Sequence, residues 1–297
     1  MRERAALPTI EATMRIIFGS FALLASPALA QEAPQGPPAG IPPPGETVFD
    51  DTWVTIGVGA AYSPSYSGSD DYRLAVLPVV QGKVAGVRVE PRPAGLALNV
   101  LPEVRGKPSL SFGPVIRVRS DRADDIEDPV VELAGELDRA VEVGATAGLN
   151  IPGVLTRFDT LSFTVDLRQD VAGAHSGMVV EPRVSWGSPL SRAAFVQLSA
   201  GAEFVSNDYA RYYQSVSPAQ AAASGLPQFA ADGGLNALGA NLLVGYDLDG
   251  NALNGGLGLV MIAAYSRLQG DAARTPYTSL RGDADQALVV LGIGYTF

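Results

Sequence analysis

The sequence predicts an all-β fold: a transmembrane antiparallel up-and-down β-barrel of about twelve strands, preceded by a signal peptide and a Pro-rich linker. From Thr52 onward, apolar and polar residues alternate with the period of two that a strand has when its two faces meet different surroundings. The alternating runs are about 10 to 13 residues long, longer than soluble strands and suited to crossing a bilayer at a tilt. No uninterrupted apolar stretch reaches the roughly 18 residues that a transmembrane helix needs, so any membrane span must be built from strands.

Residues 1–30 have the pattern of a cleavable signal peptide. Arg15 precedes an apolar run over 16–24, and Ala28-Leu29-Ala30 supplies the small-x-small triplet that signal peptidase accepts. Cleavage is therefore expected after Ala30. Met14 is a more ordinary start than Met1, because residues 1–13 include Glu3 and Glu11, which the first region of a signal peptide usually lacks.

The remaining chain divides into a linker and one domain. Residues 31–51 are rich in Pro and Gly, which predicts an extended periplasmic linker without a core of its own. No shift in composition divides residues 52–297, so we expect one outer-membrane barrel there.

The alternation is cleanest where Leu161, Phe163 and Val165 oppose Ser162 and Thr164. The predicted strands are 52–62, 71–80, 83–90, 94–101, 110–119, 141–150, 161–168, 177–187, 194–206, 237–248, 253–266 and 287–297. The weakest piece is 83–101, because Pro91 and Pro93 interrupt strand pairing.

The connections between these strands segregate by length. The short ones, expected at the periplasmic end, are Gln81–Gly82, Pro102–Pro108, Ile151–Arg157, Gly187–Ala193 and Asp247–Asn251. The long ones, at 63–70, 120–138, 207–236 and 267–286, lie at the opposite end. Short periplasmic turns with long external loops are typical of outer-membrane barrels.

Aromatic residues near the strand ends predict two interfacial girdles. Those near the periplasmic ends are Trp53, Phe158, Trp186, Phe195 and Tyr246, and those near the outer ends are Tyr62, Tyr72, Phe204 and Tyr265. Packing in a core is the alternative for these side chains.

The last strand carries the most specific signal. Val289, Leu291 and Ile293 share one face with Tyr295 and Phe297, and the sequence stops at Phe297. Tyr295 and Phe297 resemble the aromatic terminus that the barrel-insertion machinery recognises, so we expect that machinery as a partner.

Composition excludes several function classes. A net charge of −10 and only two lysines argue against nucleic-acid binding, which needs clustered basic residues. The absence of cysteine removes disulfides, thiolate catalysis, Cys-based zinc sites and a lipidated cysteine.

A lipid hydrolase at the outer rim is an alternative, because His175, the only histidine, lies between Asp170 and Ser176. Neighbours along a strand point to opposite faces, so this spacing does not build a triad. We expect no enzyme, no catalytic or cofactor-binding residue, no cofactor and no metal ligand.

The residues expected to face the lumen carry both signs of charge. They are Arg117, Arg119, Glu142, Asp166, Arg168, Glu181, Arg183 and Glu203. Buried opposite charges pair, so a barrel filled this way should be narrow or closed; a substrate-specific channel remains an alternative.

The outer loops are acidic. Their carboxylates are Asp70, Asp71, Asp121, Asp124, Asp125, Glu127 and Asp128. Oxygen ligands suit divalent cations that would bridge to lipopolysaccharide phosphates, and a solvated charge run is the plainer alternative.

Four segments resemble the MipA/OmpV family of MltA-interacting proteins. They are residues 57–73, with the string AAYSPSYSGSDDYR; 168–177; 216–227, with QAAASGLP; and 265–273. Their spread covers 52–297, although 83–108 is shorter and richer in Pro than the family pattern. The resemblance implies an outer-membrane scaffold that bridges a lytic transglycosylase and a murein synthase, with surface adhesion as another role among relatives.

Such a scaffold would meet its partners in the periplasm. We therefore expect the contacts on the linker 31–51 and on the short turns, with Asp247–Asn251 the most exposed turn. The bilayer and lipopolysaccharide are the other expected partners.

The mature protein should begin at Gln31, because the cleavage triplet ends at Ala30. N-terminal sequencing of protein extracted from the outer-membrane fraction tests this. Recovery of residues 14–30 in that fraction would show that the segment is not removed.

Overall fold

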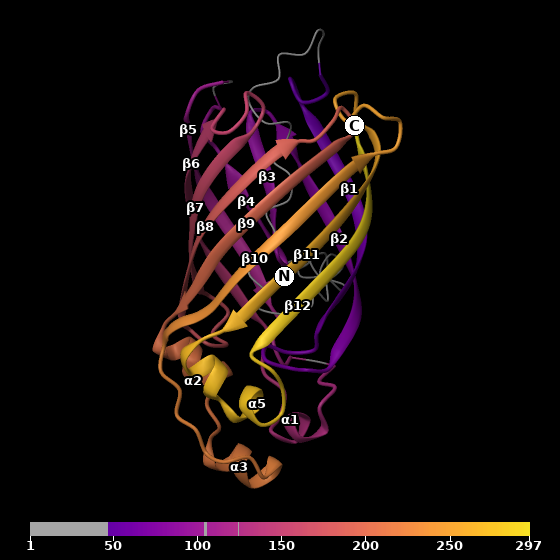
Figure 1. The fold of residues 1–297 in the computed structure, drawn as a ribbon. Coiled ribbons are helices and arrows are strands. Elements are labelled where there is room, and N and C mark those ends of the chain that lie inside the picture. Colours follow the sequence, from indigo (N-terminus) through magenta and orange to yellow (C-terminus); the bar gives the residue numbers. More distant parts are fainter. Residues whose placement is uncertain (1–46, 104–105, 124) are drawn as a thin grey trace, which may run out of the picture.

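The computed structural model describes residues 47–103, 106–123 and 125–297, so the predicted signal peptide, its cleavage site and linker residues 31–46 lie outside the described chain. Twelve strands form one closed antiparallel barrel in which each strand pairs with its neighbours in sequence and β1 pairs with β12 (Figure 1). The predicted fold class and strand number are confirmed.

The strands are β1 Trp53–Pro64, β2 Tyr72–Val84, β3 Val87–Arg92, β4 Gly95–Asn99, β5 Ser109–Arg119, β6 Ala140–Pro152, β7 Thr160–Asp170, β8 Met178–Pro189, β9 Ala194–Val205, β10 Gly234–Asp247, β11 Gly256–Leu268 and β12 Asp285–Thr296. The short helices are α1 Pro129–Leu133, α2 Asn207–Tyr213, α3 Pro218–Ser224, α4 Gly270–Arg274 and α5 Pro276–Ser279. All five helices lie in long connections at the end opposite the C-terminus (Figure 1). Among the described helices, none is long and apolar enough to cross a membrane.

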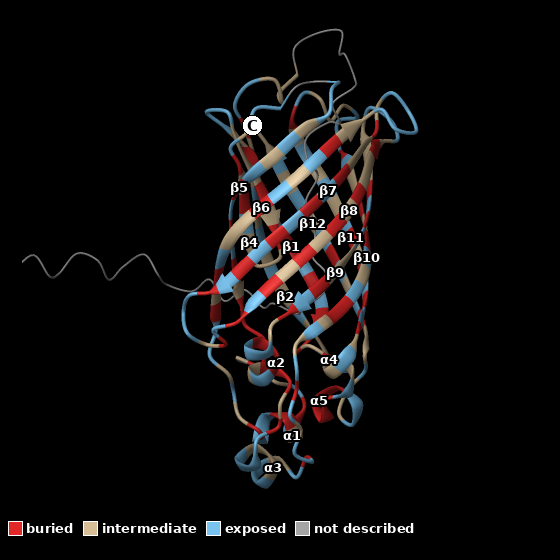
Figure 2. Ribbon diagram, turned by 90° about the vertical axis from the view of Figure 1, so that its left-hand side faces the viewer, coloured by how far each residue is buried: buried red, intermediate tan, exposed pale blue. Residues whose placement is uncertain are grey.

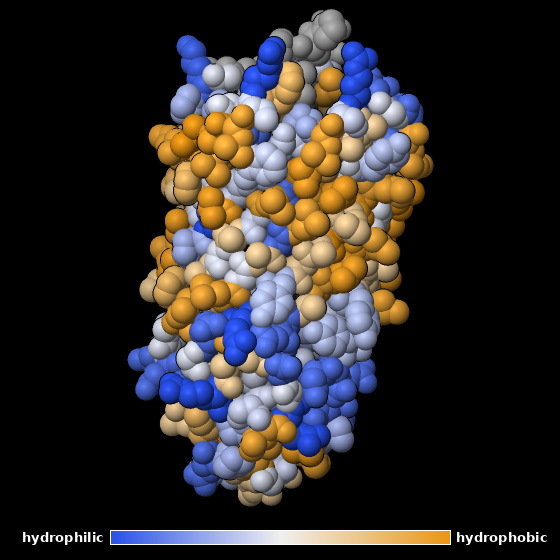
Figure 3. Space-filling view, viewed as in Figure 1, coloured by the Kyte–Doolittle hydropathy of each residue, from blue (hydrophilic) through white to orange (hydrophobic). Residues whose placement is uncertain are grey.

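Alternation along each strand separates a polar interior from an apolar exterior. In β7, Ser162, Thr164 and Asp166 are buried, whereas Phe163 and Val165 are 46% and 44% exposed. The same alternation is visible as buried and exposed stripes along the strands in Figure 2. Apolar side chains gather over the strands in Figure 3, with hydrophilic groups toward both ends. Such an apolar belt is stable in lipid, where a closed barrel leaves no open edge.

One predicted turn is wrong. Gln81 and Gly82 lie inside β2, opposite Thr55 and Val54 of β1. Gly82 lets the backbones of β1 and β2 come close together, because a Cβ there would lie 2.5 Å from the Trp53 carbonyl oxygen. The turn is Ala85–Gly86, whose φ angles of 50° and 82° match the two left-handed positions of a tight hairpin turn.

The strands predicted at 83–90 and 94–101 are shorter than expected. The β3–β4 hairpin spans only Val87–Asn99, and the β2–β3 pairing runs only from Gly82↔Val89 to Val84↔Val87. Among the described residues, positions 74–81 of β2 therefore have a strand partner only in β1. We call this line of missing strand pairing, which runs beside residues 74–81 of β2 on the side toward β5, the β2–β5 seam. Pro91 accounts for part of it, since proline has no N–H for a ladder.

The aromatic girdles are confirmed for some residues and wrong for others. Tyr62, Phe204, Tyr246 and Tyr265 are exposed on the barrel surface. Trp53, by contrast, is 3% exposed and packs edge-on against Phe49. Phe195 packs against an apolar cluster inside the barrel. These two side chains follow the core-packing alternative, because they fall on inward positions of the alternation.

The last strand closes the barrel. β12 pairs with β11 and with β1, and just beyond it the Phe297 amide donates to the Val54 carbonyl at 2.9 Å. Leu291, Ile293 and Tyr295 lie on the outer face, as predicted.

Replacing Phe297 with Asp should block barrel assembly but not secretion, because this strand must be recognised and paired before the barrel closes. Heat-modifiable gel mobility of the outer-membrane fraction measures assembly. The conservative Phe297→Tyr variant should assemble normally. Normal levels of a folded Phe297→Asp protein would contradict the role assigned to this terminus.

Candidate functional site

The outer half of the barrel contains a charged core. Its strands β3 to β9 place inward, on alternate positions, five arginines and five carboxylates, all buried: Arg92, Arg117, Arg119, Arg168 and Arg183, with Glu90, Glu142, Asp166, Glu181 and Glu203. The formal charges of this set cancel. Such balance is what burial requires, because an unpaired buried charge is strongly destabilising.

Three glutamates link arginines across the barrel interior. Glu142 accepts from Arg119 Nε at 2.6 Å and from Arg168 Nε at 2.9 Å. Glu203 accepts from Arg119 Nη2 at 3.1 Å, and Glu181 accepts from Arg117 Nη1 at 3.4 Å and pairs with Arg168. The eight charged residues predicted to face the lumen are thus brought together into one network.

The sequence reasoning missed Arg92 and Glu90. Arg92 lies at the end of β3, and its Nε donates to Asp166 Oδ2 at 2.9 Å across the barrel interior. Its Nη2 lies 3.4 Å from Glu90 Oε2. The alternation of Arg88, Glu90 and Arg92 could have shown this, but the prolines around it made the segment look irregular. The charged core therefore holds the short β3–β4 hairpin.

The opposite wall of the interior carries an apolar cluster. Ala61, Leu243, Ile262 and Val290, from β1, β10, β11 and β12, form a buried cluster. Leu77, Val260 and Leu288 pack against it and are half-buried. The lumen consequently has two unlike sides, one on β3–β9 that holds the charged core and one on β10–β2 that holds the apolar cluster.

A cap of loops and helices is joined to the charged core. Asn236 Nδ2 donates to Glu203 Oε1 at 2.6 Å, and Gln214 Nε2 donates to Asn236 Oδ1 at 2.5 Å. Thr275 Oγ1 then donates to the Gln214 carbonyl at 2.6 Å. Arg119 also stacks on the Tyr209 ring at 4.9 Å. The outer mouth is therefore covered by segments that hydrogen-bond to the core.

The end with short turns, which we call the periplasmic rim, is built differently. Asp159 accepts the backbone amides of Val154, Leu155 and Thr156 at 2.8–3.0 Å and the Trp186 indole N–H at 2.9 Å. Burial alone would raise the pKa of Asp159, but these hydrogen bonds, led by the indole, hold it below its ordinary value. The turn is thus ordered by a carboxylate that stays ionised.

The rim exposes apolar side chains at its turn tips. Leu155, Leu190 and Leu248, on three different turns, are 75%, 65% and 48% exposed. The expectation that Asp247–Asn251 is the most exposed turn is wrong: 153–157 is exposed at every position, whereas Asp247 is buried because its carboxylate accepts amides within its own turn. Next to the rim, the Val48 amide donates to the Leu253 carbonyl at 3.0 Å.

Comparison with known families shows to which protein family the chain belongs. Residues 56–297 match the family model described as MltA-interacting protein MipA. The chain belongs to the MipA family. Together with the apolar belt, this membership identifies an outer-membrane protein. No curated protein matches the chain.

Solved structures share the barrel architecture at low identity. An outer membrane channel from Pseudomonas putida F1 is 14% identical, with a TM-score of 0.43, over 86% of this chain and 100% of that one. The outer membrane protein OprD from Pseudomonas aeruginosa is 9% identical, with a TM-score of 0.33, over 85% and 95%. The outer membrane channel DcaP of Acinetobacter baumannii is 9% identical, with a TM-score of 0.31, over 83% and 96%.

In this MipA-family barrel, His175 is a buried packing residue. Its Nδ1 accepts the Gly177 amide at 3.0 Å, its Nε2 lies 3.4 Å from Glu142 Oε1, and its ring packs edge-on against Tyr209. Asp170 accepts the backbone amides of His175 and Ser176, both at 2.9 Å, so it shapes the loop and does not orient the imidazole.

The acidic outer loops are mixed. Asp70, Asp71, Asp125 and Glu127 are exposed, as in a solvated charge run, whereas Asp121 and Asp128 are buried and hold the loops in place. Asp128 caps α1 by accepting from Val130 and Val131 and also accepts from Arg281 Nε at 2.9 Å. Burial alone would raise its pKa, but the Arg281 and backbone hydrogen bonds hold it below its ordinary value. Asp121 is buried and accepts the Ser67 amide.

The other predicted acids do not gather around a cation. Asp125 pairs with Arg73 at 3.3 Å, and Asp124 lies outside the described residues. Within the described ranges, no group of three or more His, Asp or Glu has an arrangement suited to a metal.

Replacing Glu142 with Gln should lower the free energy of unfolding by about 3 kcal/mol, because Arg119 and Arg168 would each lose a buried ionic partner. Urea titration read by heat-modifiable mobility measures this. The exposed Glu132→Gln variant in α1 is the matched control and should unfold like the wild type. Equal stability of both variants would contradict the importance of the network.

Proposed function

We propose that this protein is a non-catalytic outer-membrane anchor that holds murein-processing enzymes at its periplasmic rim. MltA, the protein that the family's description names, is the first expected partner. A murein synthase is the second, as the family resemblance implies.

The charge-filled interior is the observation that carries this proposal. A diffusion channel needs a continuous aqueous path, whereas here the outer half of the lumen is occupied by ten paired charges and covered by the cap. A barrel filled in this way uses its interior for rigidity. That leaves the surfaces at its two ends as the places where it acts.

The periplasmic rim supports a docking role. Leu155, Leu190 and Leu248 offer apolar contacts on turns, and the Leu155 turn is fixed in place by Asp159. Preformed apolar groups bind with a small loss of conformational entropy, which favours specific association.

Replacing Leu155 with Ser should weaken capture of purified MltA about tenfold, because an exposed apolar anchor is lost while the turn keeps its backbone hydrogen bonds. The measurement is quantitative pull-down with the detergent-solubilised barrel. A deletion of 31–46 in the same assay tests the linker.

Leu133→Ser is the matched control. Leu133 is 62% exposed, similar to Leu155, but lies at the end of α1 in the outer cap. Its replacement should leave capture unchanged. Full capture by both the Leu155 variant and the linker deletion, or equal loss in the Leu133 variant, would refute rim docking.

A narrow, substrate-specific channel is a second candidate, favoured by one observation. The apolar wall keeps Leu77, Val260 and Leu288 half-buried beside the charged core, a combination suited to guiding an amphipathic solute. Single-channel recording decides this: a conductance that changes on Arg168→Ala would support the channel over the anchor.

A further inference from the structure

Arg122 lies buried in the outer cap, in the connection between β5 and α1. It is 2% exposed, and its φ of 52° lies in the left-handed region that residues with a Cβ seldom adopt. Its carbonyl accepts the Leu137 amide at 2.8 Å, which fixes this backbone position. The fold therefore holds a guanidinium away from solvent.

This guanidinium makes no hydrogen bond or close ion pair with an anion in the described chain, and the neighbouring Asp121 carboxylate acts on it only through its charge. None of its three nitrogens makes a hydrogen bond, and no carboxylate there lies within ion-pair distance. Its neighbour Asp121 is directed to the Ser67 amide at 2.8 Å. Arg122 is instead stacked on the Tyr277 ring, 3.9 Å from its centroid. Stacking uses the face of the guanidinium and leaves its N–H donors available at the edge.

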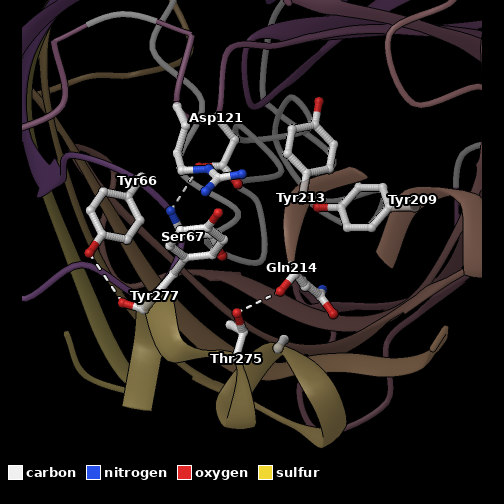
Figure 4. A pocket seen from close by; sticks show the side chains of 10 residues that line it. Tyr66, Ser67, Asp121, Tyr209, Tyr213, Gln214, Thr275 and Tyr277 are labelled. Atoms are coloured by element: carbon white, nitrogen blue, oxygen red, sulfur yellow. Dashed lines mark hydrogen bonds between the residues drawn. The ribbon is translucent and has the colours of Figure 1, made fainter. Parts of the chain in front are cut away.

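Arg122 lines a small cavity in the outer cap. Other lining residues include Tyr66, Asp121, Tyr209, Tyr213 and Tyr277 (Figure 4). The Tyr213 and Tyr277 hydroxyls are also buried without a hydrogen-bond partner. Burial raises the pKa of Tyr213, so its hydroxyl remains a donor at neutral pH.

The size of the cavity limits its occupant. The space between its atoms is about 310 Å³, including its open mouth. We therefore expect only a small occupant, of no more than a few heavy atoms.

We propose that Arg122 is the centre of a binding site for a small monovalent anion, either a halide or the carboxylate of a small organic acid. The guanidinium would supply charge and paired N–H donors, a geometry that matches a carboxylate. The buried tyrosine hydroxyls would add further donors. The site lies in the outer cap and is independent of partner docking at the periplasmic rim.

Chloride NMR line width, measured on the detergent-solubilised protein, tests this site. The wild type should broaden the chloride signal, and acetate should reverse the broadening by competition. Benzoate, which is too large for the cavity, should not. Relative displacement by acetate distinguishes a carboxylate site from one that prefers halide.

Arg122→Met should abolish the acetate-sensitive broadening. Arg122→Lys keeps the positive charge but loses the paired N–H donors of the guanidinium, so it should weaken chloride binding about tenfold. Arg211→Met is the matched control, since Arg211 lies in the same cap but is exposed and paired with Asp208. Heat-modifiable mobility verifies that each barrel is folded.

Three results would overturn the proposal. They are unchanged broadening in a folded Arg122→Met or Arg122→Lys barrel, displacement by benzoate as strong as by acetate, and a wild type without acetate-sensitive broadening. A normal MltA capture with any of these would leave the anchor function intact.

Discussion

Pairing of buried charge is the interaction on which the rest of this structure depends. Ten ionisable side chains leave water when the barrel closes, and each is tolerated only because a partner of opposite sign lies beside it. Glu142 joins β6 to the arginines of β5 and β7, so the strands are fixed to one another through the interior as well as through their backbone ladder.

Two otherwise weak parts of the molecule are held by the same network. The β3–β4 hairpin has short ladders, and the Arg92–Asp166 pair ties it to β7. The cap has little regular structure, and the hydrogen bonds from Gln214 through Asn236 to Glu203 tie it to β9. Closure of the outer mouth is thus a consequence of the same buried carboxylates that stiffen the wall.

The sequence was sufficient for the architecture because the period of two is a direct record of which face a residue occupies. It placed Arg117, Glu142 and Glu181 in the lumen and Leu291 and Tyr295 on the outer face. It was insufficient for Gly82, because a glycine needed for close strand contact looks the same as a turn glycine until its partner is known. The burial of Arg122 could not be predicted from the sequence either. It depends on α5, which lies about 150 residues further along the chain and places the Tyr277 ring against the guanidinium.

The β2–β5 seam makes the barrel wall easier to deform at one place than elsewhere. A complete ladder resists widening because many hydrogen bonds must break together, whereas here only a few pairs join β2 to β3. Strain applied to the barrel, by membrane bending or by a pulling partner, would concentrate along this line. The Arg92–Asp166 pair joins the β3–β4 hairpin to β7 beside this line, so loss of that pair would let the wall yield further.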